Sequence, residues 1–219
     1  FGKGQGELKL VKAKFRGVPI PDSTVQVKAE GDELEYLFNL GRDRLRGKYV
    51  RSSDGKRDEL EFKFQDYDFA PLLTLALSRD IPPMADLKAT GDLAVTGNFE
   101  DWGTLKGSGT VSQLLVGFKG TPMKLARPAK IKMDHLGTRI ESLFLQGEDS
   151  ELTVAMNFES DKRLDARLDG RIDLQYLQPF IPGLEYGNGK VSAGLRLSGH
   201  PSRYQLLGNL SLEGGSFRL

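Results

Sequence analysis

The sequence predicts an all-β protein: an elongated, repetitive antiparallel sheet with one or two short helices. Three observations predict it. Apolar and polar residues alternate in several segments, the 26 glycines fall largely at turns or on apolar positions, and one stretch recurs further along the chain. The strand content that this implies is well above the usual share for globular proteins.

Alternation is clearest at residues 164–174, where apolar residues or glycine occupy every second position and charged residues stand between them. Successive side chains of an extended chain point to opposite faces, so one face is apolar and the other carries a row of opposite charges. A helix would scatter the same leucines around its axis. The segment is therefore predicted to be a strand, with Asp165, Asp169 and Asp173 on a salt-bridged outer face.

The recurrence relates residues 85–111 to residues 188–212, and residues 60–64 upstream to residues 164–168. The period is on the order of a hundred residues. Superposing the two copies aligns three pairs of residues: Gly97 with Gly199, Leu93 with Leu195, and Val95 with Leu197.

The repeat divides one continuous β structure into three parts, and we expect the chain to be an interior stretch of a longer protein. The parts are an N-terminal β segment at 1–66, a first repeat unit with a short helix and strands at 67–172, and the start of a second unit at 173–219.

About fourteen strands are expected in all. The first, 7–15, changes the phase of its alternation at Val11, which indicates a bulge. Outside the two copies and their flanks, the expected strands are 24–30, 34–40, 45–50, 60–64, 114–118, 140–145, 152–158 and 164–174.

Two segments break the alternation. Residues 69–77 are too densely apolar for a half-exposed strand, Pro71 fits a first helical turn, and Asp68 can cap it. Residues 174–180 form a similar apolar segment, closed by a Pro-Gly pair. We expect a short helix at each.

Composition excludes several functions. The chain has 31 basic and 30 acidic residues with interleaved signs, unlike a nucleic-acid-binding footprint. It has no cysteine for disulfides or thiolate zinc sites, and no apolar run as long as a membrane-spanning helix. His135 and His200 lack a second ligand at metal spacing. We therefore expect no enzymatic activity, no metal and no cofactor.

A long sheet with one apolar face must cover that face with a second sheet, by curling, or with something other than protein. Glycine and alanine interrupt the larger residues on this face. Small residues either leave room for a ligand such as acyl chains or relieve crowding where the sheet coils tightly. Composition alone favours the second interpretation.

Two apolar segments, DFAPLLTLAL and DLQYLQPFIPGL, together with G-x-L-x-V-x-G at 91–97 and L-x-G-x-G at 105–109, resemble the repeats of the bacterial TamB and AsmA-like family. The resemblance implies a taco-like sheet with an apolar groove. It also implies the periplasm of a Gram-negative bacterium, in a protein anchored in the inner membrane by a segment outside this stretch.

The same resemblance implies a bridge-like lipid transfer function in membrane biogenesis. The expected partners are phospholipid acyl chains and, through the parent protein, an outer-membrane β-barrel protein of the Omp85 type. The predicted groove lining is formed by the apolar positions of the strands: Val25, Val27, Phe38, Leu40, Phe62, Phe64, Leu93, Val95, Val111, Leu152, Val154, Leu164, Leu168, Ile172, Leu195, Leu197, Leu210 and Leu212.

The leading hypothesis is a β-groove that binds and conducts phospholipid acyl chains between the inner and outer membranes. One alternative is an assembly module that hands outer-membrane proteins to a β-barrel partner by edge pairing. Another is a structural β spacer, whose interior would be filled with side chains.

Overall fold

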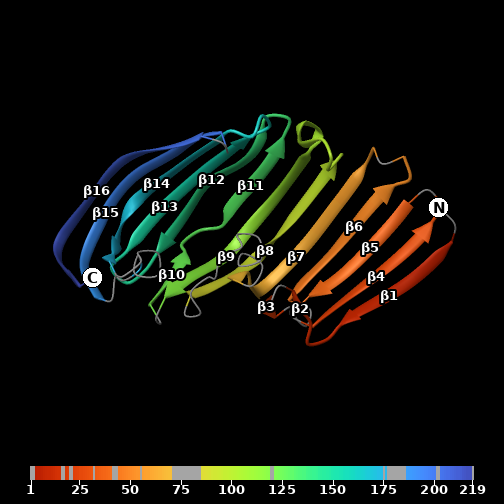
Figure 1. Cartoon of the computed structure of the whole chain (residues 1–219), viewed down its shortest axis with the longest axis horizontal. Helices are drawn as coiled ribbons and strands as arrows, with labels where there is room; N and C mark the ends of the chain where they lie inside the picture. Colours follow the sequence, from red (N-terminus) through yellow and green to blue (C-terminus); the bar gives the residue numbers. More distant parts are fainter. Residues whose placement is uncertain are drawn as a thin grey trace.

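The computed structural model describes residues 3–15, 18–19, 22–31, 33–40, 44–54, 56–70, 85–118, 121–174, 176, 186–200 and 203–218. These residues form one antiparallel sheet of 14 strands and a separate two-stranded sheet. The all-β prediction is confirmed. Figure 1 shows the large sheet as one curved layer, with the two ends of the chain at opposite ends of it.

Strand order in the large sheet follows chain order almost throughout. The path is β1 (Gly4–Leu10), β4 (Ser23–Glu30), β5 (Glu33–Leu40), β6 (Leu45–Ser52), β7 (Asp58–Asp68), β8 (Ala85–Gly97), β9 (Lys106–Phe118), β10 (Thr121–Leu125), β12 (Gly137–Gln146), β13 (Glu151–Glu159), β14 (Leu164–Asp173), β15 (Tyr186–His200) and β16 (Arg203–Arg218).

Strand β11 (Ala129–Asp134) is the exception to this path, because it pairs with both β9 and β12. It lies beside one half of β9, whereas β10 lies beside the other half. The small sheet consists of β2 (Lys14–Phe15) and β3 (Val18–Pro19), and a 3-10 turn, η1 (Trp102–Thr104), connects β8 to β9.

Two details of the strand prediction are wrong. The phase change at Val11 is the end of β1 at Leu10, and not a bulge within a longer strand. Residues 114–118 are not a separate strand, because β9 runs through them with a register irregularity opposite Thr90 and Gly91. The irregularity shifts the alternation by one residue without ending the strand.

The predicted helices fall largely outside the described residues, at 71–84 and within 177–185. At the first of them, the backbone N–H of Ala70 donates to the Asp68 carboxylate at 3.0 Å, the contact expected of a capping residue. Among the described residues, no helix is both long and apolar enough to cross a bilayer.

Buried apolar residues gather in two clusters on one face of the sheet. The first contains Leu45, Phe64, Tyr67 and Ala89, and the second contains Met123, Leu145, Ile172, Leu174 and Val191. Both clusters lie at the same end of the strands, where β7 and β14 end and β8 and β15 begin.

The strands form two similar blocks of five, β5–β9 and β12–β16, which we call the first block and the second block. Gly97 pairs with Asp58 in the first block, and Gly199 pairs with Leu164 in the second. Both glycines have positive φ, at 136° and 128°. This register makes Phe62 equivalent to Leu168, so the sequence match of 60–64 to 164–168 is out of step by two residues.

Candidate functional site

The pairing register places every predicted lining residue on one face of the sheet, which we call the apolar face. Phe38, for example, lies opposite Val25 on β4 and Gly47 on β6, and Phe62 lies opposite Gly47 and Leu93. Residues directly opposed in an antiparallel sheet point to the same side. The rows continue without a change of face through β9–β16.

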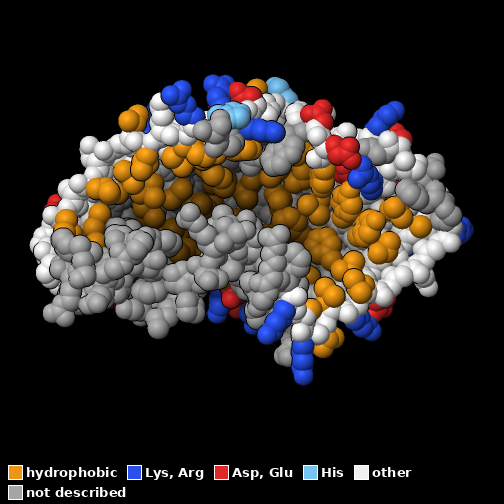
Figure 2. Space-filling view, in the orientation of Figure 1, with side chains coloured by type: hydrophobic (Ala, Val, Ile, Leu, Met, Phe, Trp, Pro, Cys, Tyr) orange, Lys and Arg blue, Asp and Glu red, His pale blue; other side chains and the backbone are white. Residues whose placement is uncertain are grey.

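Figure 2 shows this face hollowed, with hydrophobic side chains lining the hollow and charged side chains gathered at its rim. The middle of the face is only half-buried, at Phe62, Leu93, Leu168 and Leu195 among others. A sheet covered by a second protein layer would bury such residues fully.

Other predicted lining residues divide into two groups. Phe64, Val95 and Ile172 are 8%, 5% and 7% exposed and belong to the protein core. Leu210 and Leu212, on β16, are 63% and 43% exposed. The apolar face is therefore most open at β16, and it is closed at the two clusters and, towards the other end of the strands, at Val95.

Three glycines in the middle of the apolar face do not widen the hollow, whereas Gly4 and Gly6 on β1 have open space above them. A Cβ at Gly47 would collide with the ring of Phe38, and one at Gly91 would lie 2.8 Å from Cζ of Phe64. A Cβ at Gly109 would lie 2.8 Å from a methyl carbon of Leu93. Neighbouring side chains thus occupy the space above Gly47, Gly91 and Gly109, which supports the crowding interpretation at these three positions.

One acidic residue, Asp58, lies on the apolar face and is completely buried. Its carboxylate accepts hydrogen bonds from the Tyr49 hydroxyl at 2.7 Å and the Phe99 backbone N–H at 3.0 Å, and the Arg51 guanidinium lies 3.8 Å away. Burial, followed by the hydrogen bond to Asp58, raises the pKa of Tyr49. Asp58 shares the parity of Leu60, so its place on the apolar face is predictable from the sequence, whereas its complete burial is not.

The opposite face, here the outer face, carries ion pairs between neighbouring strands, as predicted for Asp165. Two nitrogens of Arg196 donate to the Asp165 carboxylate at 2.9 Å each, and this hydrogen bond holds the pKa of Asp165 below its ordinary value. Lys48 likewise contacts Glu35 at 3.0 Å. Such exposed pairs stabilise a sheet only slightly.

No cluster of three or more potential metal ligands occurs in the part of the chain that the structure describes. His135 and His200 are exposed. The described residues therefore present a partly exposed apolar surface on one face of the sheet and charged side chains on the other. Comparisons with protein-family models, with curated proteins and with solved structures give no match, so the resemblance to TamB and AsmA-like repeats remains a prediction from the sequence.

Proposed function

We propose that the apolar face binds phospholipid acyl chains and conducts them along the sheet. One observation carries the proposal: a single apolar face continues from β1 to β16 and stays half-exposed in its middle. Soluble proteins rarely leave a contiguous apolar surface of this extent uncovered.

Acyl chains match this surface in chemistry and in dimension. Each buried methylene stabilises the bound chain by about 0.8 kcal/mol. At about 4.8 Å between neighbouring strands, the path from β1 to β16 extends roughly 60 Å along its curve, about twice the hydrocarbon thickness of a bilayer. With the acyl chains against the apolar face, the lipid headgroup would lie at the charged rim of the hollow, where it stays in contact with water. Transport between the inner and outer membranes of a Gram-negative cell follows if the family resemblance holds.

Photocrosslinking tests the proposal directly. Benzoylphenylalanine replaces Leu168 or Leu195, which face each other on β14 and β15, and the chain is incubated with phospholipid vesicles. We expect phospholipid adducts at both positions. Arg167, the exposed neighbour of Leu168 on the outer face, is the matched control and should give none. Equal labelling of both faces, or no labelling, contradicts the proposal.

A charge on the apolar face provides a second readout. Leu168→Lys should sharply reduce the phospholipid that co-purifies with the chain, as quantified by mass spectrometry, because contact with an acyl chain would strip water from the lysine ammonium. Thr96→Lys adds the same charge at an exposed outer-face position and should leave the bound phospholipid unchanged. Circular dichroism of both variants controls for folding.

Strand β16 favours one alternative, the assembly module. Among the described residues it pairs only with β15, and its Leu206, Leu207 and Leu210 are 62–63% exposed. The middle of β16, residues 204–212, carries no charged side chain, and an exposed edge of this kind accepts an added strand. Crosslinks that run from β16 to polypeptide, with no lipid adduct at Leu168, would replace the lipid proposal with this one.

A further inference from the structure

One buried hydroxyl on the apolar face is unpaired. Tyr67 belongs to the first of the two apolar clusters and is 3% exposed, and its hydroxyl oxygen has no hydrogen-bond partner among the described residues. No other buried side-chain oxygen or nitrogen in the described part of the chain is left in this way. A buried hydroxyl without a partner destabilises the folded chain, so its presence needs a physical explanation.

The backbone is arranged to bring Tyr67 to the apolar face. Tyr67 is three positions after Phe64, so regular alternation would point the two side chains to opposite faces. A bulge between them adds one residue: Phe64 lies opposite Gly91 and Tyr67 lies opposite Ala89, two positions apart on β8 and therefore on the same face. The bulge thus turns the phenol inward.

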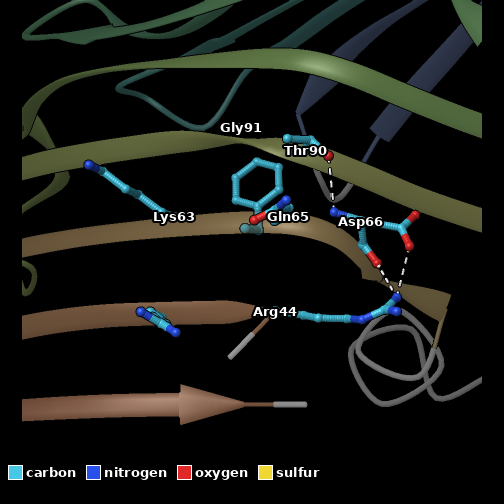
Figure 3. Close-up of a pocket in the computed structure, with 8 residues that line it drawn as sticks. Arg44, Lys63, Gln65, Asp66, Thr90 and Gly91 are labelled. Atoms are coloured by element: carbon cyan, nitrogen blue, oxygen red, sulfur yellow. Dashed lines mark hydrogen bonds and ion pairs between the residues drawn. The ribbon is translucent and has the colours of Figure 1, made fainter. Parts of the chain in front are cut away.

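Contacts on the outer face hold the bulge in place. Asp66 has a positive φ of 45°, unusual for a residue other than glycine. Its backbone N–H donates to the Thr90 hydroxyl oxygen at 3.0 Å, and the Arg44 guanidinium donates to its carbonyl oxygen at 2.9 Å and to its carboxylate at 2.8 Å. Figure 3 shows Thr90 and Arg44 reaching Asp66 from its two sides. The inward position of Tyr67 is therefore built into a strained but well-tied backbone.

The second block lacks both the bulge and the hydroxyl. The residue equivalent to Tyr67 is Ile172, because their partners Ala89 and Val191 each lie eight positions before the positive-φ glycine of the block. Pairing of β14 with β15 is regular throughout, and Ile172 is 7% exposed. An apolar side chain fills this position without a bulge, so packing alone does not require a phenol here.

The surroundings of the hydroxyl supply no acceptor. The other members of the cluster are apolar, and so are the partly buried side chains packed against it. A buried water usually needs about two to four polar partners, whereas the side chains of the cluster offer it only this hydroxyl. Burial, followed by the charge of Asp68, raises the pKa of Tyr67, so the phenol keeps its proton and remains a donor at neutral pH.

Tyr67 lies where the apolar face meets the polar end of the strand. It is the second-last residue of β7, and Asp68 beside it is exposed. In the other direction the apolar face continues to the half-buried Phe62 and Leu93, roughly 15 Å away along the strands. A phospholipid has the same order of groups, because its ester links a polar headgroup to an apolar chain. The ester carbonyl oxygen is the strong hydrogen-bond acceptor closest to that chain.

We propose that the Tyr67 hydroxyl donates a hydrogen bond to the ester carbonyl oxygen of a bound phospholipid, so that the first block prefers ester-linked to ether-linked chains. This preference rests on the proposed binding of acyl chains to the apolar face. The ester supplies the acceptor that the cluster lacks, and the acyl chain extends from it toward Phe62 and Leu93.

Phe69 is the neighbour that opens the way to the hydroxyl. Its ring lies edge-on to that of Tyr67, with the ring centroids 5.0 Å apart, and it directly follows the last residue of β7. The side chain is only partly buried, while its backbone N–H donates to the Leu87 carbonyl oxygen at 2.9 Å. The ring therefore turns aside as the lipid enters, and the backbone stays in place.

Photocrosslinking at one position in each block tests the preference. Benzoylphenylalanine replaces Leu93 in the first block or its equivalent, Leu195, in the second. The full chain is incubated with vesicles that contain equal amounts of diacyl and dialkyl phosphatidylcholine of the same chain length, and mass spectrometry measures the ratio of the two lipids in the adducts. We expect the diacyl lipid to be enriched about fivefold at Leu93, as for one hydrogen bond, and not enriched at Leu195.

Two phenol variants show whether the hydroxyl is responsible. Tyr67→Phe keeps the ring, so only the enrichment at Leu93 should disappear. The free energy of unfolding of the lipid-free variant should stay the same or rise, because an unpaired buried hydroxyl is removed, whereas a structural hydroxyl would give a decrease. Tyr49→Phe removes a hydroxyl that has its acceptor in Asp58, and should keep the enrichment.

The outcomes separate the ester preference from acyl-chain binding itself. Equal amounts of the two lipids in the Leu93 adducts, equal enrichment at Leu93 and Leu195, or enrichment that survives in Tyr67→Phe would each overturn the role of Tyr67 and leave acyl-chain binding in place. Absence of adducts at both positions would overturn acyl-chain binding and the ester preference together.

Discussion

The first and second blocks share strand order and register, yet they differ on the apolar face, most clearly at the residue opposite one glycine. Asp58 in the first block and Leu164 in the second each lie opposite a positive-φ glycine. Asp58 is completely buried and hydrogen-bonded, whereas Leu164 is half-buried.

The connection that follows accounts for the difference. Eight residues, 98–105, join β8 to β9, whereas only 201–202 join β15 to β16. The longer connection includes Phe99, which stacks on Tyr49 with ring centroids 5.8 Å apart and donates its N–H to Asp58. A carboxylate on an apolar face can thus serve to anchor a loop, and it does not by itself mark a binding site.

Removal of that anchor should have the largest effect. Asp58→Ala leaves the Tyr49 hydroxyl and the Phe99 N–H without their acceptor, and we expect the free energy of unfolding to fall by about 3 kcal/mol. Urea denaturation measures it. Leu164→Ala, at the equivalent position, is the control. If the two substitutions lower the free energy of unfolding equally, the anchoring role of Asp58 is wrong.

A glycine of the first block gives the next largest effect. Gly47 lies opposite Phe38, and the equivalent pair in the second block is Val154 opposite Leu143. Gly47→Val should destabilise the chain by about 2 kcal/mol, because the new side chain overlaps the Phe38 ring. Adding Phe38→Leu recreates the pair of the second block and should recover part of the loss. A double-mutant cycle without coupling would contradict this.

High pH should produce a smaller effect, confined to the first block. The pKa of Tyr49 is raised, so the folded state favours the protonated phenol. The raised pKa contributes to the free energy of unfolding. This contribution is complete below the ordinary tyrosine pKa of about 10 and is lost as the pH rises through the pKa of Tyr49 in the folded state. Burial raises the pKa of Tyr67 in the same window. Tyr49→Phe should flatten the fall of unfolding free energy above pH 10, whereas Met156→Leu, at the equivalent position, should not.

The outer face should give the smallest effect. Arg196 pairs with Asp165 in the second block, and Ala94 occupies the equivalent position in the first. Arg196→Ala should shift the urea midpoint less than any change above, because both partners are solvent-accessible. Added salt should remove the remaining difference from the original chain. A large shift that persists in salt would show that the outer face contributes more than exposed ion pairs do.

Periodicity predicted the sheet, but it could not distinguish a bulge from the end of a strand. The alternation changes phase at Val11 and again near Ser112, and only the second strand continues. The difference comes from the partner: β8 lies beside β9 on both sides of its irregularity, whereas the described pairing of β1 stops at Leu10. A local pattern holds no information about that partner.

The composition of the apolar face was also predictable, because parity alone assigns each lining residue to it. The degree to which the apolar face is exposed to solvent could not be predicted from the sequence. The ring of Phe38 lies over Gly47, and the curvature of the sheet decides how far Leu168 is exposed. The bulge in β7 at Asp66 escaped prediction for a related reason, since it depends on the positive φ of Asp66 and on the register shift between Phe64 and Tyr67.

The near-perfect match between strand order and chain order bears on how the molecule reaches its shape. Each strand finds its neighbour within a few tens of residues, so closing each new hairpin costs little chain entropy. The sheet can therefore grow from whichever hairpin forms first, one strand at a time, as linear repeat proteins do. The length of the sheet can then change in evolution, because inserting or deleting a β-hairpin lengthens or shortens the sheet and leaves the apolar residues of the other strands on the same face.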